Sequence, residues 1–282
     1  MAIAKVYFIT GAGRGIGQAL ITAALEAGHY VVATARDSSQ ITDAVGQHNR
    51  LLPLSMDVTD ITAVEEAVRK ACDHFGSIDV LVNNAGRFYT GFFETVSAEN
   101  VRAQMEVNFF GTLNVTRAIL PVMRAQRRGH IVSVSAMLGI VGAPFASSYA
   151  ASKFALEGWA ESLSEEVKPF GIHTTIVEPG AFRTKDDPAH AARSVFPDVD
   201  IDDYAEATVK GTASIKDHNG KEVGHPGKLA DALVKVIDMA VPPRRWVAGT
   251  DAYKGIVKKG QQLIDDANAL YELTNSLDWN TK

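Results

Sequence analysis

The alternation of short apolar runs with helix-like segments constrains the fold of this chain more than any other feature. Seven runs have the composition of buried strands: residues 4–10, 30–35, 51–58, 79–86, 129–135, 172–180 and 246–249. Helical spacing of apolar residues is found at 16–28, 59–75, 97–126 (as two helices) and 147–168. Strands that alternate with helices pair in parallel through right-handed crossovers. The sequence therefore predicts one α/β domain over 1–282, a doubly wound parallel sheet of about seven strands with helices on both faces.

Composition favours a small-molecule partner in a reducing compartment. Apolar residues make up 46% and charged residues 22% of the chain, and the net charge of -5 argues against nucleic acid or an anionic membrane as the main partner. The single cysteine, Cys72, excludes an internal disulfide. The apolar start of the chain runs directly into a glycine-rich turn and lacks the features of a signal peptide. We expect a cytoplasmic protein.

Two segments depart from the strand–helix pattern. Residues 183–226 are polar and contain proline and glycine, and an insertion of this length is more often a lid over a site than a spacer. A variable surface loop is the alternative. Residues 253–277 have the pattern of an amphipathic helix, which we expect to pack on the core or against a partner subunit.

The stretch TGAGRGIG, residues 10–17, joins the first strand to the first helix. Glycines at Gly11, Gly15 and Gly17 permit positive φ and let a pyrophosphate approach the backbone N–H groups of the helix. The helix dipole favours an anion at this end. A glycine motif between a strand and a helix near residue 10 is typical of a dinucleotide-binding site.

The end of the second strand favours NADP(H) over NAD(H). An NAD site usually has an acidic residue there to bind the ribose 2′-hydroxyl. In this chain Ala35 and Arg36 end the run, and Arg14 lies within the glycine turn. Two guanidinium groups suit a 2′-phosphate through charge-assisted hydrogen bonds. Asp37 could take the acid's role if the strand ended one residue later, which keeps NAD(H) as the alternative.

A Tyr-x-x-x-Lys pair, Tyr149 and Lys153, completes a set of motifs that resembles the short-chain dehydrogenase/reductase family. The motifs occur in order: TGAGRGIG, DV at 57–58, NNAG at 83–86, the Asn of VNFFG, YAASK, and EPG at 178–180. The resemblance covers residues 4 to about 182 and the rest more loosely. It is closer to the bacterial and fungal oxidoreductases of about 280 residues that carry ATARD and NFFG. It implies a Rossmann fold and an NAD(P)-dependent oxidoreductase.

The resemblance also implies which residues hold the cofactor. Asp57 would contact the adenine amino group, with Val58 against the ring, and residues around Gly180 would border the nicotinamide. The full expected set is Gly11, Arg14, Gly15, Ile16, Gly17, Arg36, Asp57, Val58, Asn84, Ala85, Gly86, Tyr149, Lys153, Pro179, Gly180, Phe182 and Thr184.

Tyr149 and Lys153 are four residues apart on a predicted helix, so both side chains share one face. A phenol has a pKa of about 10, and a neighbouring ammonium together with the nicotinium charge should lower it toward the working pH. Tyr149 is therefore the expected acid/base for interconverting a ketone or aldehyde and an alcohol. By resemblance, Lys153 also holds the nicotinamide ribose, and Asn108 holds a water that links Lys153 to solvent.

The sequence departs from the family pattern at Ala136, where the family has a serine that bonds the substrate oxygen. Ser135 is the neighbour, but adjacent strand side chains point to opposite faces. Three interpretations remain: Ser135 substitutes through a local bulge, the site works without this hydroxyl or with another donor, or activity is weakened or lost. A catalytically silent NADP(H)-binding sensor or scaffold is thus the alternative function.

Apolar residues are expected at the substrate end, notably Phe88, Met137 and Phe145, which suits a hydrophobic substrate. The eight histidines form no metal-binding spacing, so no metal is expected. By resemblance, the helix with Tyr149 and the helix over 108–123 form a subunit interface, in a homodimer or homotetramer. The natural substrate, the direction and the stereochemistry of the reaction do not follow from the sequence.

Overall fold

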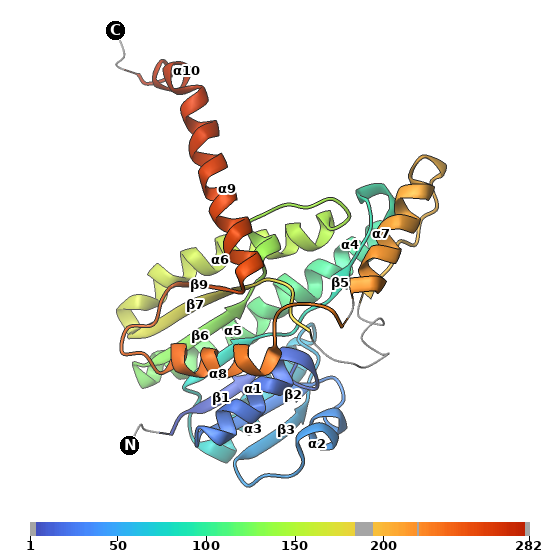
Figure 1. The fold of residues 1–282 in the computed structure, drawn as a ribbon. Coiled ribbons are helices and arrows are strands. Elements are labelled where there is room, and N and C mark those ends of the chain that lie inside the picture. Colours follow the sequence, from blue (N-terminus) through green and yellow to red (C-terminus); the bar gives the residue numbers. More distant parts are fainter. Residues whose placement is uncertain (1–3, 184–193, 219, 280–282) are drawn as a thin grey trace.

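The structure, a computed structural model, describes residues 4–183, 194–218 and 220–279, and a parallel sheet of seven strands lies at its centre (Figure 1). These strands are β1 (Val6–Ile9), β2 (Tyr30–Ala35), β3 (Leu51–Ser55), β4 (Val80–Asn83), β6 (Gly129–Val134), β7 (Ile172–Pro179) and β9 (Arg245–Ala248). Their order is β3-β2-β1-β4-β6-β7-β9, and every neighbouring pair is parallel. The predicted doubly wound sheet is confirmed.

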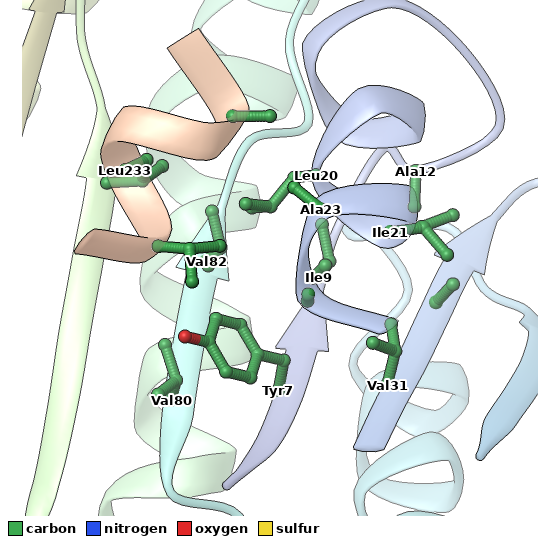
Figure 2. Close-up of a cluster of buried hydrophobic side chains, with 14 of the residues drawn as sticks. Tyr7, Ile9, Ala12, Leu20, Ile21, Ala23, Val31, Val80, Val82 and Leu233 are labelled. Atoms are coloured by element: carbon green, nitrogen blue, oxygen red, sulfur yellow. The ribbon is translucent and has the colours of Figure 1, made fainter. Parts of the chain in front are cut away.

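Helices cover both faces of this sheet. One face carries α1 (Gly15–Glu26) and α8 (Pro226–Ile237), and the other carries α3 (Ile61–Phe75), α5 (Gly111–Gln126) and α6 (Ser147–Val167). The strands are apolar on successive residues because both faces are buried. In β1, Tyr7 and Ile9 belong to the core under α1 and α8, whereas Val6 and Phe8 belong to the other core. Figure 2 shows the first of these cores, with Leu20 of α1 and Leu233 of α8 beside the strands.

The segment over 97–126 forms the two expected helices, α4 (Ala98–Met105) and α5, joined by one π-helical turn (Glu106–Phe110). The sequence pattern did not indicate this wider turn. Because π turns interrupt the regular hydrogen-bond ladder, they frequently occur at functional sites. Asn108 lies at the centre of this one.

Several short elements were not expected from the sequence. Residues 39–45 form α2 (Ser39–Val45), and the polar insertion contains β8 (Ser194–Val195), a 3-10 turn (Asp202–Tyr204) and α7 (Ala205–His218). β8 pairs in parallel with β5 (Phe88–Tyr89), directly after the NNAG motif. The insertion is thus attached to the loop that follows β4, which brings it near the carboxyl ends of the central strands.

The C-terminal segment forms α9 (Thr250–Ala269) and a short α10 (Tyr271–Asn275). The expected helix is present, but it does not pack along the core. Its first turn contacts the body, where Ala252 is buried, and the remainder extends away from the sheet (Figure 1). Within the described residues, no helix has the length and apolar character that crossing a bilayer requires.

Candidate active site

A cavity of about 1010 Å³ lies at the carboxyl ends of the central strands. Ligands of doubly wound sheets bind at this edge, where the strand order reverses. The expected site residues that line the cavity are Gly11, Arg14, Ile16, Arg36, Asp57, Val58, Asn84, Ala85, Gly86, Phe88, Ser135, Met137, Tyr149, Lys153, Pro179, Gly180 and Phe182. Those outside the lining are Gly15, Gly17, Asn108 and Phe145. Thr184 lies outside the described residues.

The glycine turn is fixed by the loop that follows β4. The Asn84 side-chain amide donates to the backbone oxygens of Thr10 and Gly11, both at 3.0 Å. The Thr10 hydroxyl accepts from the backbone N–H groups of Asn84 and Ala85, also at 3.0 Å. These bonds join the ends of β1 and β4, so the first helix begins at a fixed position under the cavity.

The three glycines of the turn are required for two different reasons. Gly11 and Gly15 have positive φ, 62° and 57°, as expected. Gly17 does not, which corrects the expectation for that residue. A Cβ on Gly17 would lie 2.6 Å from the Asn84 amide nitrogen and from the Gly11 oxygen. Gly17 is therefore needed for close packing of the helix against the turn.

The end of the cavity beside the last residue of β2 is lined by Ala35, Arg36 and Gln40. Arg36 is exposed, so its guanidinium is open to a ligand. Asp37 is outside the lining, and its carboxylate accepts from the Ser39 N–H at 3.0 Å, which holds the pKa of Asp37 below its usual value. The carboxylate therefore caps the start of α2, and this position does not support Asp37 as a ribose ligand. Sequence reasoning missed Gln40 because it lies on the unexpected helix α2.

Farther along the same edge, Asp57 and Val58 line the cavity. The Asp57 carboxylate accepts from the backbone N–H of Thr59 at 2.9 Å and from its hydroxyl at 2.7 Å. Val58 is buried against Gly111, and its backbone oxygen accepts from the Asn114 amide at 3.1 Å. The loop after β3 is thereby held over the start of α5, with one wall of the cavity formed by Asp57 and Val58.

Tyr149 and Lys153 both face the cavity from α6. The Lys153 ammonium lies 5.8 Å from the centre of the Tyr149 ring and donates to the Val134 oxygen at 2.8 Å. Burial lowers the pKa of Lys153 to about 8, opposed by the charge of Glu157. Burial raises the pKa of Tyr149 to about 12. The expected lowering of the Tyr149 pKa is therefore not produced by the groups of this chain, because burial of the phenol acts in the opposite direction.

Asn108 is fully buried in the π turn and does not face the cavity. Its side-chain amide donates to the Arg87 oxygen and to the Ser152 hydroxyl, both at 3.0 Å, and its oxygen accepts from the Arg87 N–H at 2.8 Å. Asn108 therefore ties the loop after β4 to α6. Sequence reasoning identified the residue through its motif, but these contacts depend on three segments that only the fold brings together.

Ala136 lines the cavity beside Tyr149, with an extended backbone. The neighbouring Ser135 hydroxyl is turned toward Glu157 and Gly139: a Cβ on Gly139 would lie 2.6 Å from it. Burial raises the pKa of Glu157, and the Ser135 hydroxyl beside that carboxyl acts in the opposite direction. This orientation does not support Ser135 as a replacement for the missing hydroxyl at 136, because the hydroxyl lies against Gly139 and Glu157, and the strand pairing up to Val134 has no bulge.

Two of the three expected substrate residues line the cavity. The Phe88 ring meets the Tyr149 ring edge-on, with 4.7 Å between centres, and Met137 reaches the base of α9 at Gly255. Phe145 is the exception. Its φ is 67°, and its ring packs against Phe92, 5.2 Å between centres, and against Gly211 of α7. This left-handed backbone turns the Phe145 ring from the cavity toward the insertion.

Residues distant in sequence complete the cavity beside Gly180. The Asp251 carboxylate, on the first turn of α9, accepts from the Ala181 N–H at 2.7 Å and fills the space next to Gly180. Glu222, from the insertion, also lines the cavity. No motif marked either residue, since both are far along the chain from the elements they meet.

The insertion packs on aromatic side chains of two other loops, through Phe92 and Phe145. The Tyr204 ring stacks on Phe92, with 5.0 Å between centres, and its hydroxyl donates to Glu94 at 2.7 Å. Gly211 meets Phe145, as described above. In the part of the chain that the structure describes, no three His, Cys, Asp or Glu side chains are grouped to hold a metal.

Comparison with known proteins gives one consistent family. The family model of short chain dehydrogenases matches residues 5–192. An oxidoreductase of Botryotinia fuckeliana is 39% identical over 92% of this chain and 94% of its own. A 3-ketodihydrosphingosine reductase of Bacteroides thetaiotaomicron is 36% identical over 87% of this chain and 88% of its own. The crystal structure of a short-chain dehydrogenase from Streptomyces avermitilis superposes with a TM-score of 0.88 at 33% identity, covering 98% and 100% of the two chains.

Proposed function

The chain belongs to the short-chain dehydrogenase family of NAD(P)-dependent oxidoreductases, and we propose that it interconverts a hydrophobic ketone or aldehyde and its alcohol with NADP(H). The observation that carries the proposal is the position of Tyr149 and Lys153 in the cavity that also contains the glycine turn. A proton donor and a dinucleotide site in one cavity are the two requirements of this reaction.

The residues of the cavity fit a dinucleotide. Gly11 and Gly17 leave no room for a Cβ against Ala85 and Asn84, so the turn has the backbone that a pyrophosphate needs. Arg36 and Arg14, both exposed and both lining the cavity, would bind the 2′-phosphate of NADP(H). Asp57 and Val58 would hold the adenine, the residues from Asn84 to Gly86 would flank the cofactor, and Pro179, Gly180 and Phe182 would border its nicotinamide end. When bound, the nicotinamide supplies or accepts the hydride.

Tyr149 would move the proton. With a pKa of about 12, the phenol is protonated at neutral pH, which is the state that donates to the oxygen of a ketone. Lys153, with a pKa of about 8, is mostly charged at pH 7 and would hold the nicotinamide ribose. An additional positive charge near the ring would lower the Tyr149 pKa, which aids the reverse direction. Asn108 would hold the loop and α6 in register and, as in the family, a water near Lys153.

The proposed site works without the serine hydroxyl at position 136. Loss of one donor to a developing oxyanion costs about 10²–10³ in rate, far less than an enzyme supplies. Tyr149 remains to bind the substrate oxygen. The activity would therefore be reduced rather than absent.

The substrate would be apolar. Phe88, Met137 and Leu138 line the cavity beside Tyr149. The name of the Bacteroides relative refers to reduction of a keto compound, 3-ketodihydrosphingosine, which agrees with a hydrophobic ketone. We also propose that 183–226 acts as a lid, since Glu222 lines the cavity and α7 rests on Phe145.

We further propose one cytoplasmic domain that forms a homodimer or homotetramer through α5 and α6. Phe110 and Phe154, each 44% exposed, are apolar side chains on these helices or directly before them. A mass near 30 kDa in solution would contradict this assembly.

The test measures NADPH absorbance with a panel of ketones and aldehydes for three proteins: the natural chain, Tyr149→Phe and Ala136→Ser. We expect slow consumption by the natural chain, at least a tenfold gain for Ala136→Ser, and loss for Tyr149→Phe with NADPH binding retained. An unchanged rate in Ala136→Ser would show that another donor already acts. No consumption by any of them, with tight NADPH binding, would favour the silent sensor or scaffold.

A further inference from the structure

Large apolar side chains of α9, α10 and the residues that adjoin them are left uncovered by the rest of the described chain. Nine of them are between 53% and 99% exposed: Tyr253, Val257, Leu263, Ile264, Leu270, Tyr271, Leu273, Leu277 and Trp279. Every residue from 261 to 274 is exposed, and Figure 1 shows α9 leaving the body after its base. Isolated helices are marginal in water, and most helix stability comes from packing of an apolar face. These uncovered apolar side chains therefore indicate that another molecule packs against α9.

The apolar residues of α9 follow the spacing of a two-helix seam. Alternating steps of three and four residues connect one row: Tyr253, Ile256, Gly260, Leu263, Ala267 and Leu270. Val257 and Ile264 lie along one side of this row. Such a repeat is narrow, and it packs against one other helix by inserting each side chain between those of the partner.

Charge along α9 identifies the partner. Three lysines, Lys254, Lys258 and Lys259, lie in the first half, where the acidic Asp251 is bonded to the Ala181 N–H, and Asp265 and Asp266 lie in the second. A second copy of α9 running antiparallel would set the basic half of each helix against the acidic half of the other. A parallel copy would set like charges together, which is unfavourable.

In an antiparallel pair centred between Gln261 and Gln262, every residue of the row lies opposite another residue of the row. This register places Ile256 opposite Ala267, Gly260 opposite Leu263, and Tyr253 opposite Leu270, so that a large side chain meets a smaller one in the two central layers. Beside this seam, Lys259 meets Asp266 on one edge and Val257 meets Ile264 on the other. Each contact occurs twice, because a two-fold axis relates the copies.

We propose that α9 is a self-association surface whose occupant is α9 of a second copy of this chain, in antiparallel orientation. The contact is separate from the catalytic cavity and from the faces of α5 and α6. It therefore stands or falls independently of the proposed reaction. If α5 and α6 also pair, the α9 contact joins dimers into tetramers, or adds a second contact within one dimer.

A charge swap tests the pairing on the full-length protein, with molar mass measured by light scattering over a range of micromolar concentrations. Lys259→Asp and Asp266→Lys each turn two attractive pairs into like-charge pairs, so each should raise the dissociation constant about tenfold. The double variant restores opposite charges and should return the constant to its original value. Lys254→Asp makes the same charge change on the outer side of α9, away from the seam, and should raise the dissociation constant far less than Lys259→Asp does.

Leu263→Asp places a charge in the seam and should raise the dissociation constant at least 100-fold. If the natural protein has a molar mass of about 30 kDa at every concentration, it does not self-associate and the proposal is overturned. An unchanged dissociation constant for Leu263→Asp would overturn it as well, since α9 would then have another occupant. Failure of the double swap to restore assembly, while Lys259→Asp weakens it, would also overturn the antiparallel arrangement.

Discussion

Replacing Arg245 with leucine is expected to destabilise the protein by an amount that grows with pH. The Arg245 guanidinium joins α6 to the sheet: it bonds Glu157 at 2.5 Å and Glu178 and Glu161 at 2.7 Å. The side chains of Glu157 and Glu178 are only 5% and 2% exposed. Arg245→Leu therefore leaves two buried carboxyl groups near each other without their cation.

Removing one partner of a buried ion pair typically costs about 3–5 kcal/mol. The lower end applies here, because the Arg245 side chain is 37% exposed and solvent screens part of its charge. A loss of about 3 kcal/mol in a chain of this size corresponds to a fall of roughly 5 °C in Tm. Leu at this position keeps much of the apolar packing, so the expected change is mainly electrostatic.

The sign of the pH dependence follows from Glu157. Burial raises the pKa of this carboxyl above its usual value, whereas Arg245 acts to lower it. Without Arg245 the Glu157 pKa rises further. A carboxyl whose folded pKa is raised contributes stability that is present below its unfolded pKa, near 4.5, and lost as pH rises through the folded pKa. The deficit of Arg245→Leu relative to the natural chain should thus be small at pH 5 and large at pH 8.

Thermal unfolding followed by circular dichroism at pH 5, 6.5 and 8 measures this difference. The matched control is Arg244→Leu. Arg244 forms an ion pair with Glu165, and both of these side chains are about 60% exposed. That variant should lose less than about 1 kcal/mol, with little dependence on pH. Equal losses for both variants, or a deficit in Arg245→Leu that stays constant from pH 5 to 8, would refute the reasoning.

Two further predictions concern the cofactor side of the cavity. Arg36→Ala should weaken NADPH binding about 10- to 100-fold and leave NADH binding nearly unchanged, as measured by fluorescence titration; equal effects on both cofactors would argue against a phosphate contact. Gly17→Ala should lower both Tm and NADPH affinity, because the added Cβ meets Asn84 and the turn itself at 2.6 Å. Its control is Gly158→Ala on an exposed part of α6, where the added Cβ would meet no atom from another part of the described chain within 4 Å, which should raise stability slightly.

The order of the elements was predictable because it depends on local pattern. Strands that are buried on both faces are apolar at successive residues. The run from Val6 to Ile9 could therefore be predicted as a strand from its own residues alone. Amphipathic helices such as α3, whose apolar residues gather on one face, were equally predictable. The polar insertion was not, since its apolar contacts become evident only in the fold, where Gly211 of α7 meets Phe145 and the preceding Tyr204 stacks on Phe92.

At the candidate site, the spacing within one segment was predictable and contacts between segments were not. Tyr149 and Lys153 lie one turn apart on α6, so their common face followed from the sequence. Asp251 could not be found in this way, because its contact with Ala181 spans 70 residues. The orientation of Ser135 was predictable only in part. Strand alternation indicated that its hydroxyl turns away from the face of Ala136, but only the fold shows that it lies against Glu157 of α6.

The sequence by itself determined the individual strands, the glycine turn after the first of them, and the common face of Tyr149 and Lys153, because each depends on residues within one strand, one helix or one strand–helix junction. The tertiary structure decided the pKa of Tyr149, the orientation of Ser135 and the exposure of α9. Each of these depends on which groups surround a side chain and how much water reaches it. Burial and distance are properties of the packed chain, and residues far apart in sequence determine both.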